Sequence, residues 1–197
     1  MARGCRAPAA LAAGLLALAL LFQSTVDLPS ALGYDEYTII ALPFASPTAH
    51  ANPRLETSIL NWLNRAREAQ QLPPLRAEVT IQNVARRYGH DLFANGYLSH
   101  VSRDGRTLQD RLAAGGLQPQ IAGENLAYAR TLSDAERALW QSEPHRRNIL
   151  YPGFRAVGVA VIDGGNKGLI VVQDFADDPA AQDTTTPAPA IDLKPVQ

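Results

Sequence analysis

The stretch Ala156–Phe175, AVGVAVIDGGNKGLIVVQDF, decides the fold class of this chain. Two runs rich in β-branched residues, 156–162 and 169–175, flank the glycine-rich segment 163–168. This pattern is typical of two antiparallel strands joined by a turn. A third strand is predicted at 124–129, where the sequence is ENLAYA. We therefore expect a small antiparallel sheet whose hairpin ends the folded region.

Helical patterns precede this hairpin. Apolar residues recur every three or four positions in 56–70 and in 80–95, which predicts two amphipathic helices. Shorter helices are expected in three places: from the capping signal at 107–110 to Ala114, from the capping signal at 133–136 to the residues before Pro144, and from Arg146 to Leu150. Helices followed by a terminal hairpin predict an α+β fold, with helices covering a small antiparallel sheet.

Residues 1–33 are predicted to be a secretory signal peptide. Arg3 and Arg6 precede an uncharged apolar run from Ala9 to Phe22, and small residues at 31–33 provide a cleavage site. A membrane-spanning helix needs about 20 apolar residues, and this run is shorter. An uncleaved anchor is the alternative, because the cleavage site lies some distance beyond the run. A cleaved signal peptide predicts a secreted protein, extracellular or periplasmic, that has no stable membrane span after the signal is removed.

The rest of the chain divides into three parts. Residues 34–54 form an extended linker with a candidate short strand at 37–42, residues 55–176 form one domain, and 177–197 form a disordered Pro-, Ala- and Thr-rich tail. The single cysteine, Cys5, lies in the signal region, so the exported chain would have neither a disulfide nor a catalytic thiol. The formal net charge of −1 and the scattered basic residues argue against a nucleic-acid partner. We expect a monomer.

Two histidines and two carboxylates are the candidates for a functional site: His100, Glu124, Glu143 and His145. Such groups can ligate a divalent cation, or hold a water and move its proton. Each can also be explained without a function, as a solvated, capping or packing residue. For His50 and His90 we expect no functional role. A helix N-terminus at His145 would lower the pKa of its imidazole and favour a neutral ligand. Neighbouring polar residues are expected to support the site: Ser99, Asn125, Ser142, Arg146 and Asn148.

Other catalytic templates are absent from the sequence. It contains no His-Glu-x-x-His, no Gly-x-Ser-x-Gly, no phosphate-binding glycine loop before a helix and no Cys-x-x-Cys. A serine triad built on Ser99 or Ser142 has little support, because any chain with several serines, histidines and acids allows one.

Together these motifs resemble the CAP superfamily (cysteine-rich secretory proteins, antigen 5, pathogenesis-related 1), and specifically its cysteine-free bacterial SCP-like branch. The match covers 55–176, and the order and spacing of the motifs make it specific. The motifs are Leu63-Asn64-Arg65-x-Arg67, Tyr97-x-Ser99-His100, Asp104-Gly105, Arg111-Leu112, Gly123-Glu124-Asn125-x-Ala127, Ser142-x-x-His145-Arg146-x-Asn148-Ile149-Leu150, Phe154-x-x-x-Gly158-Val159 and Val172-Gln173-x-Phe175.

The resemblance implies a three-layer α-β-α sandwich with a central cleft that contains two histidines and two acids. His100, Glu124 and His145 match the family's motifs directly. Glu143 matches the Trp-x-x-Glu motif of some members through Trp140. Bacterial members usually have Trp-x-x-Ser-Pro-x-His instead, and here the interval from Trp to His is one residue shorter. Glu143 therefore lies either in the cleft or outside it.

The resulting hypothesis is a secreted, non-enzymatic binding module with an extracellular or cell-envelope ligand. Its cleft would hold a divalent cation (Zn²⁺, Mg²⁺ or Ca²⁺) or a small polar ligand, with His100 and His145 as the metal ligands. The alternative is a metal-assisted hydrolase of peptide or ester bonds, with Glu124 or Glu143 as the base. A further alternative is a carrier of sterols or fatty acids, which the resemblance allows.

Overall fold

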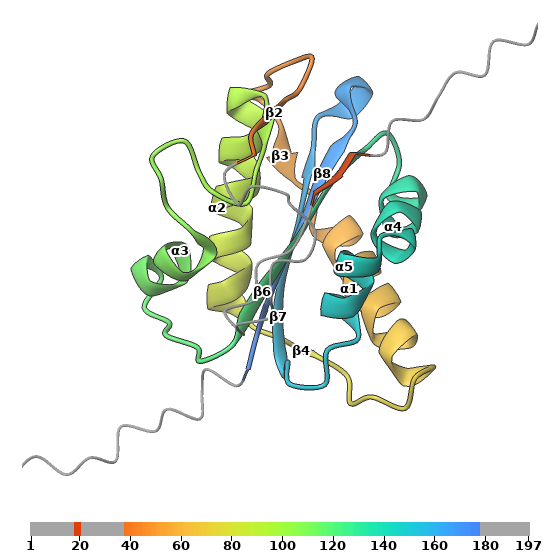
Figure 1. Cartoon of the computed structure of the whole chain (residues 1–197). Coiled ribbons are helices and arrows are strands. Elements are labelled where there is room, and N and C mark those ends of the chain that lie inside the picture. Colours follow the sequence, from red (N-terminus) through yellow and green to blue (C-terminus); the bar gives the residue numbers. More distant parts are fainter. Residues whose placement is uncertain (1–17, 21–37, 178–197) are drawn as a thin grey trace, which may run out of the picture.

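The computed structural model describes residues 18–20 and 38–177 (Figure 1). Its helices are α1 (Pro53–Glu68), α2 (Val79–Asn95), α3 (Leu108–Ala114), α4 (Leu132–Gln141) and α5 (Glu143–Ile149). Its strands are β1 (Leu18–Leu20), β2 (Ile40–Ala41), β3 (His50–Ala51), β4 (Arg76–Ala77), β5 (Tyr97–Leu98), β6 (Ala122–Ala129), β7 (Ala156–Asp163) and β8 (Leu169–Ala176). The predicted tail lies outside the described residues, apart from Asp177.

The main sheet has the strand order β1-β6-β8-β7-β3, and β4 pairs with β7 in parallel. β7 and β8 form the predicted antiparallel hairpin, and β6 is the predicted third strand, so both predictions are confirmed. The register places Glu124 of β6 opposite Asp174 of β8, and Asn125 opposite Gln173. This register decides which side chains meet at the site.

Helices cover both faces of the sheet. Figure 1 shows α2 and α3 on one side and α1, α4 and α5 on the other. Residues of β7 point to the two faces of the sheet. Val157 and Val161 pack with residues of α1 and α4, whereas Ile162 packs with residues of α2. The predicted α+β, three-layer α-β-α architecture is therefore confirmed.

The helix boundaries confirm most of the sequence predictions. The predicted capping box of α3 is present, because Thr107 and Asp110 exchange side-chain and backbone hydrogen bonds. The predicted start of α4 was wrong by two residues. Thr131, rather than Ser133, accepts the hydrogen bond from the backbone N–H of Asp134. The hydroxyl of Thr131 also donates a hydrogen bond of 2.7 Å to the side chain of Asp134.

Two further helix boundaries differ from the predicted ones. α5 begins at Glu143 and ends at Ile149, instead of running over 146–150, because a proline in the first turn of a helix has no N–H that needs a partner. α1 begins at Pro53, inside the segment expected to be linker, with Asn52 as its N-cap. The linker also holds β2, which pairs with β5, and β3, which pairs with β7. Its described part is therefore docked on the domain.

β1 pairs with β6 along Leu126–Tyr128. Its three residues belong to the apolar run of the predicted signal peptide, which otherwise lies outside the described residues. The signal peptide stays a prediction. No helix within residues 38–177 is long and apolar enough to cross a membrane.

Candidate functional site

His100 is positioned by the end of α2. Gly96 ends this helix in the left-handed conformation, with a φ of 65°, which glycine adopts without strain. The chain then turns through β5 to Ser99 and His100. Tyr88 of α2 donates a hydrogen bond from its hydroxyl to the Ser99 carbonyl at 2.5 Å. Helix α2 thus fixes the loop that carries His100.

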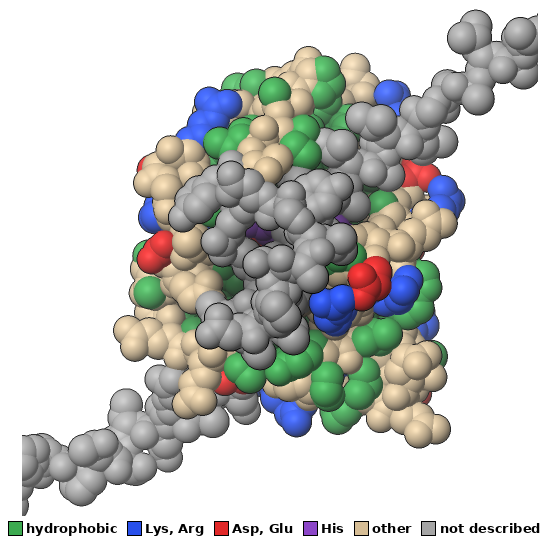
Figure 2. All heavy atoms as spheres, in the orientation of Figure 1, with side chains coloured by type: hydrophobic (Ala, Val, Ile, Leu, Met, Phe, Trp, Pro, Cys, Tyr) green, Lys and Arg blue, Asp and Glu red, His purple; other side chains and the backbone are tan. Residues whose placement is uncertain are grey.

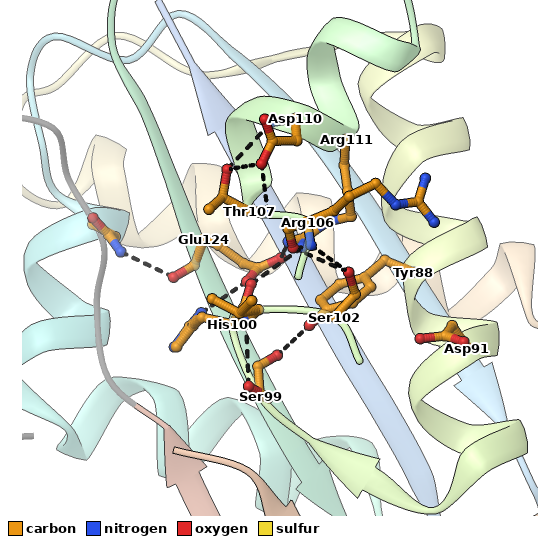
Figure 3. A network of polar contacts seen from close by, with 12 residues as sticks. Tyr88, Asp91, Ser99, His100, Ser102, Arg106, Thr107, Asp110, Arg111 and Glu124 are labelled. Atoms are coloured by element: carbon orange, nitrogen blue, oxygen red, sulfur yellow. Dashed lines mark hydrogen bonds and ion pairs between the residues drawn. The ribbon is translucent and has the colours of Figure 1, made fainter. Parts of the chain in front are cut away.

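Glu124 of β6 binds His100 and Arg111 with its two carboxylate oxygens (Figure 3). Its Oε1 lies 2.7 Å from His100 Nδ1, and its Oε2 accepts a hydrogen bond of 2.5 Å from Arg111 Nη2. Arg111 Nη1 also donates to the His100 carbonyl at 3.1 Å. The guanidinium carbon lies 3.5 Å from the centroid of the Tyr88 ring. Arg111 therefore holds both Glu124 and the backbone of His100.

These contacts keep Glu124 ionised although it is buried. Burial alone would raise its pKa, but the charge of Arg111 and the hydrogen bond with His100 lower the pKa below the usual value. With Nδ1 of His100 occupied by Glu124, the other ring nitrogen, Nε2, is buried and has no hydrogen-bond partner within the described residues. Glu124 therefore orients an imidazole whose Nε2 is available to a ligand.

Asp174 of β8 is a buried carboxyl that the sequence analysis missed. It lies opposite Glu124 in the register and is fully buried. Burial, followed by the negative charge of Glu124, raises the pKa of Asp174 well above its usual value. The site therefore holds two buried carboxyl groups whose pKa values are shifted in opposite directions. We call His100, Arg111, Glu124 and Asp174 the charged wall.

Asn125 begins a second wall, because successive strand residues point to opposite faces. Its amide nitrogen donates to Gln173 Oε1 at 3.0 Å and to the His145 carbonyl at 3.1 Å. Asn148 Nδ2 donates to Asn125 Oδ1 at 2.9 Å. Gly123 permits this packing, since a Cβ there would approach Asn148 Oδ1 to 3.1 Å. These contacts hold α5 against β6. We call Asn125, His145, Asn148 and Gln173 the amide wall.

His145 is buried within the first turn of α5. Burial, followed by the charge that His100 would carry, lowers the pKa of His145 to about 3. The expected direction of the shift was correct, although burial rather than the helix dipole is its main cause. His145 is therefore neutral at physiological pH, which is the form that ligates metals.

The two walls meet at β6, because Glu124 contacts the layer of α2 and α3 while Asn125 contacts α5 on the other side. Histidine side chains are visible in the middle of this face in Figure 2. The structure brings Glu124 into contact with His100. After burial, the charge of His100 lowers the pKa of His145, so the two rings lie within electrostatic range of each other.

Glu143 does not join this buried group. Its side chain is 60% exposed and pairs with Arg147 on the surface of α5. Arg146 donates to the Trp140 carbonyl at 2.8 Å, so it supports the junction of α4 and α5. Ser142 is the N-cap residue of α5 but forms no side-chain cap bond there. Of the expected supporting residues, Asn125 and Asn148 contact the site directly, and Ser99 lies beside His100.

The sequence analysis assigned no role to three residues of the site, Arg111, Gln173 and Asp174. Arg111 and Gln173 lie in two of the family-like motifs, and that was the only signal for them. Asp174 lies inside an apolar strand, where an acid is unusual. Within residues 38–177, no group of three or more His, Cys, Asp or Glu side chains is arranged to hold a metal ion.

A family model decides the classification of this chain. The model for the cysteine-rich secretory protein family, CAP, matches residues 60–175. The chain belongs to the CAP family. This match includes β6, β7, α5 and both histidines of the site.

Two curated relatives from Bacillus subtilis share this CAP region. The protein YkwD, described as uncharacterized, is 31% identical over 112 residues, which are 56% of this chain and 44% of YkwD. YlbC, described as an uncharacterized membrane protein, is 36% identical over 107 residues, which are 54% of this chain and 31% of YlbC. The match therefore spans less than half the length of either relative.

Solved structures support the same fold. An extracellular protein containing an SCP domain from Bacillus anthracis aligns with a TM-score of 0.55 and 34% identity, over 64% of this chain and 41% of that protein. An outer surface protein from Borrelia burgdorferi aligns with a TM-score of 0.62 over 66% of this chain and 98% of that protein. Its identity of 19% supports the fold alone.

Proposed function

We propose that this CAP domain is a non-enzymatic binding module that holds a divalent cation between His100 and His145. The observation that carries the proposal is the orientation of His100. Glu124 occupies its Nδ1 at 2.7 Å, and its Nε2 is buried without a partner within the described residues. A carboxylate behind a histidine in this way is the usual outer support of a metal-ligating imidazole.

The donor set favours a particular class of cation. Imidazole nitrogens suit Zn²⁺ and similar transition metals, whereas Mg²⁺ and Ca²⁺ prefer oxygen ligands. The pKa of about 3 at His145 keeps that ring neutral and able to ligate over the physiological pH range. Two protein ligands leave coordination positions for water or for a polar group of an external ligand. We therefore expect Zn²⁺ to bind in preference to Mg²⁺ or Ca²⁺.

A metal-assisted hydrolase is less well supported, because neither candidate base is suitably placed. Both oxygens of Glu124 are engaged, and the pKa of this residue is lowered, so it is a weak proton acceptor. Glu143 is mostly exposed and pairs with Arg147. Asp174 has a raised pKa, but it is fully buried in the sheet. The binding module remains the stronger proposal.

We propose further that the domain acts outside the cytoplasm. The predicted signal peptide supports this location, as do the extracellular protein from Bacillus anthracis and the outer surface protein from Borrelia burgdorferi. One of the matched relatives, YlbC, is described as a membrane protein.

Calorimetric titration of the full chain with Zn²⁺, Mg²⁺ and Ca²⁺ tests the cation site. We expect Zn²⁺ to bind, and His100→Ala and His145→Ala each to abolish binding. Glu124→Gln should weaken it by about 10–100-fold through loss of the outer support. His50→Ala, at an exposed histidine of β3, is the control and should leave the affinity unchanged. Zn²⁺ binding that survives the double substitution of His100 and His145 would rule out this site.

A further inference from the structure

A cavity of about 510 Å³ lies between α2 and α3. Figure 3 shows two of its lining residues, Tyr88 and Asp91, on the opposite side of the Arg111–Glu124 pair from His100. Its volume is in the range of small-molecule sites in proteins. The cavity therefore lies apart from the ring of His100. Arg111 belongs both to the lining of the cavity and to the charged wall.

The lining of this cavity carries an excess of positive charge. Arginines reach it from three elements: Arg87 from α2, Arg106 from the loop before α3, and Arg111 from α3. Asp91 is the only acid in the lining, and its carboxylate already accepts hydrogen bonds from Tyr97 and Asn95. The whole chain has a formal net charge of −1, so this local excess does not follow from composition.

The partners of these arginines leave them able to bind a ligand. Arg87 is exposed and forms no ion pair within the described residues. Arg106 pairs with Asp104 at 2.7 Å, but both side chains are more than half exposed, so water screens the pair and little energy opposes its exchange. Arg111 is 6% exposed, and its Nε is buried without a hydrogen-bond partner within the described residues.

One face of α2 adds uncharged polar groups. Thr80, Asn83 and Arg87 follow each other at helical spacing along the cavity, so their side chains lie on one face of the helix. None of the three side chains forms a hydrogen bond with another described residue. A hydroxyl and an amide beside guanidinium groups can hold the hydroxyls of a ligand whose charged end contacts arginine.

We propose that this cavity, the α2–α3 pocket, binds a small oxyanion carried on a hydroxylated molecule of about monosaccharide size. The shared chemistry is a carboxylate or phosphate group. Arg87 and Arg106 contact its oxygens. Arg111, whose guanidinium Glu124 and Tyr88 hold in place, lines the floor of the pocket with its Nε, which has no hydrogen-bond partner among the described residues. Guanidinium groups suit this role because their planar fork matches the geometry of carboxylate and phosphate.

Titration calorimetry of the full chain at low salt tests this proposal with three probes: D-glucuronate, inorganic phosphate and D-glucose. We expect saturable binding of one or both anions, with glucose at least about tenfold weaker, which corresponds to about 1.4 kcal/mol. Tighter binding of glucuronate would identify a sugar acid as the ligand class, and tighter binding of phosphate would identify a phosphorylated molecule. Higher salt should weaken the binding, because the contacting arginines are exposed.

A double substitution assigns the binding to the pocket. Arg87→Ala with Arg106→Ala should weaken anion binding by at least about tenfold, whereas Arg130→Ala with Arg137→Ala removes the same charge from exposed positions outside the lining. That control pair should leave the affinity nearly unchanged. The proposal is overturned if neither anion binds saturably, if glucose binds as tightly as glucuronate, or if the two double variants lose affinity equally.

Discussion

The charged wall and the amide wall begin at neighbouring residues of one strand, yet they hold their histidines by different physical means. Glu124 contacts the ring of His100 directly, and an ion pair with Arg111 holds Glu124 in place. Asn125 fixes His145 through its backbone carbonyl and leaves the ring out of the amide contacts. The charged wall therefore holds the ring of its histidine, whereas the amide wall holds only the backbone of its histidine.

Among the described residues, Arg111 is the one Lys or Arg side chain that contacts Glu124, so we expect the largest effect from Arg111→Met. An unpaired buried charge lowers the free energy of unfolding by about 3–5 kcal/mol. Urea denaturation at pH 7 measures this loss. Arg111→Met combined with Glu124→Gln should recover part of it, because the buried charge is then also removed. A loss below about 1 kcal/mol in the single variant would show that charge does not hold this wall together.

Asn125→Ala tests the amide wall and should cost less. It leaves Gln173 Oε1 and Asn148 Nδ2 without their partner, which lowers the free energy of unfolding by about 1–3 kcal/mol. The difference from the wild type should stay constant between about pH 5 and pH 8, because His145 has a pKa of about 3 and the amides do not titrate. Denaturation at several pH values measures it, and a steep pH dependence would contradict the assignment of this wall as uncharged.

Asp174→Asn tests the neutral carboxyl of the charged wall. Because its pKa is raised on folding, the folded protein keeps a proton that the unfolded chain releases above about pH 4. Wild-type stability should therefore fall as the pH rises from about 4 toward the raised pKa, by up to about 1.4 kcal/mol per pH unit. The asparagine variant cannot ionise, so its stability relative to the wild type should increase with pH. An unchanging difference between pH 4 and pH 8 would contradict a raised pKa at Asp174.

The sequence predicted the strands and helices that carry the two walls better than the side-chain contacts within them. The runs rich in β-branched residues at 156–162 and 169–175 carry a local signal, and so does Gly96, the glycine that ends α2. The pairing of Glu124 with Asp174 depends on strand register across 50 positions, and the contact with Arg111 depends on how α3 packs. Neither is a property of a local pattern. For the same reason, burial of His145 became visible only in the fold.

Glu143→Gln should have the smallest effect, and it tests whether this exposed acid belongs to the site. The side chain of Glu143 is 60% exposed and pairs only with Arg147 among the described residues, so its loss should change the free energy of unfolding by less than about 0.5 kcal/mol. Arg147→Gln removes the same surface pair from the other side and serves as the matched variant. Zn²⁺ affinity, measured by calorimetry, should remain at the wild-type value in both, in contrast to Glu124→Gln. A clear loss of Zn²⁺ affinity in Glu143→Gln alone would mean that this carboxylate turns toward the histidines when the cation binds. Glu143 would then join Glu124 as a second acid of the site.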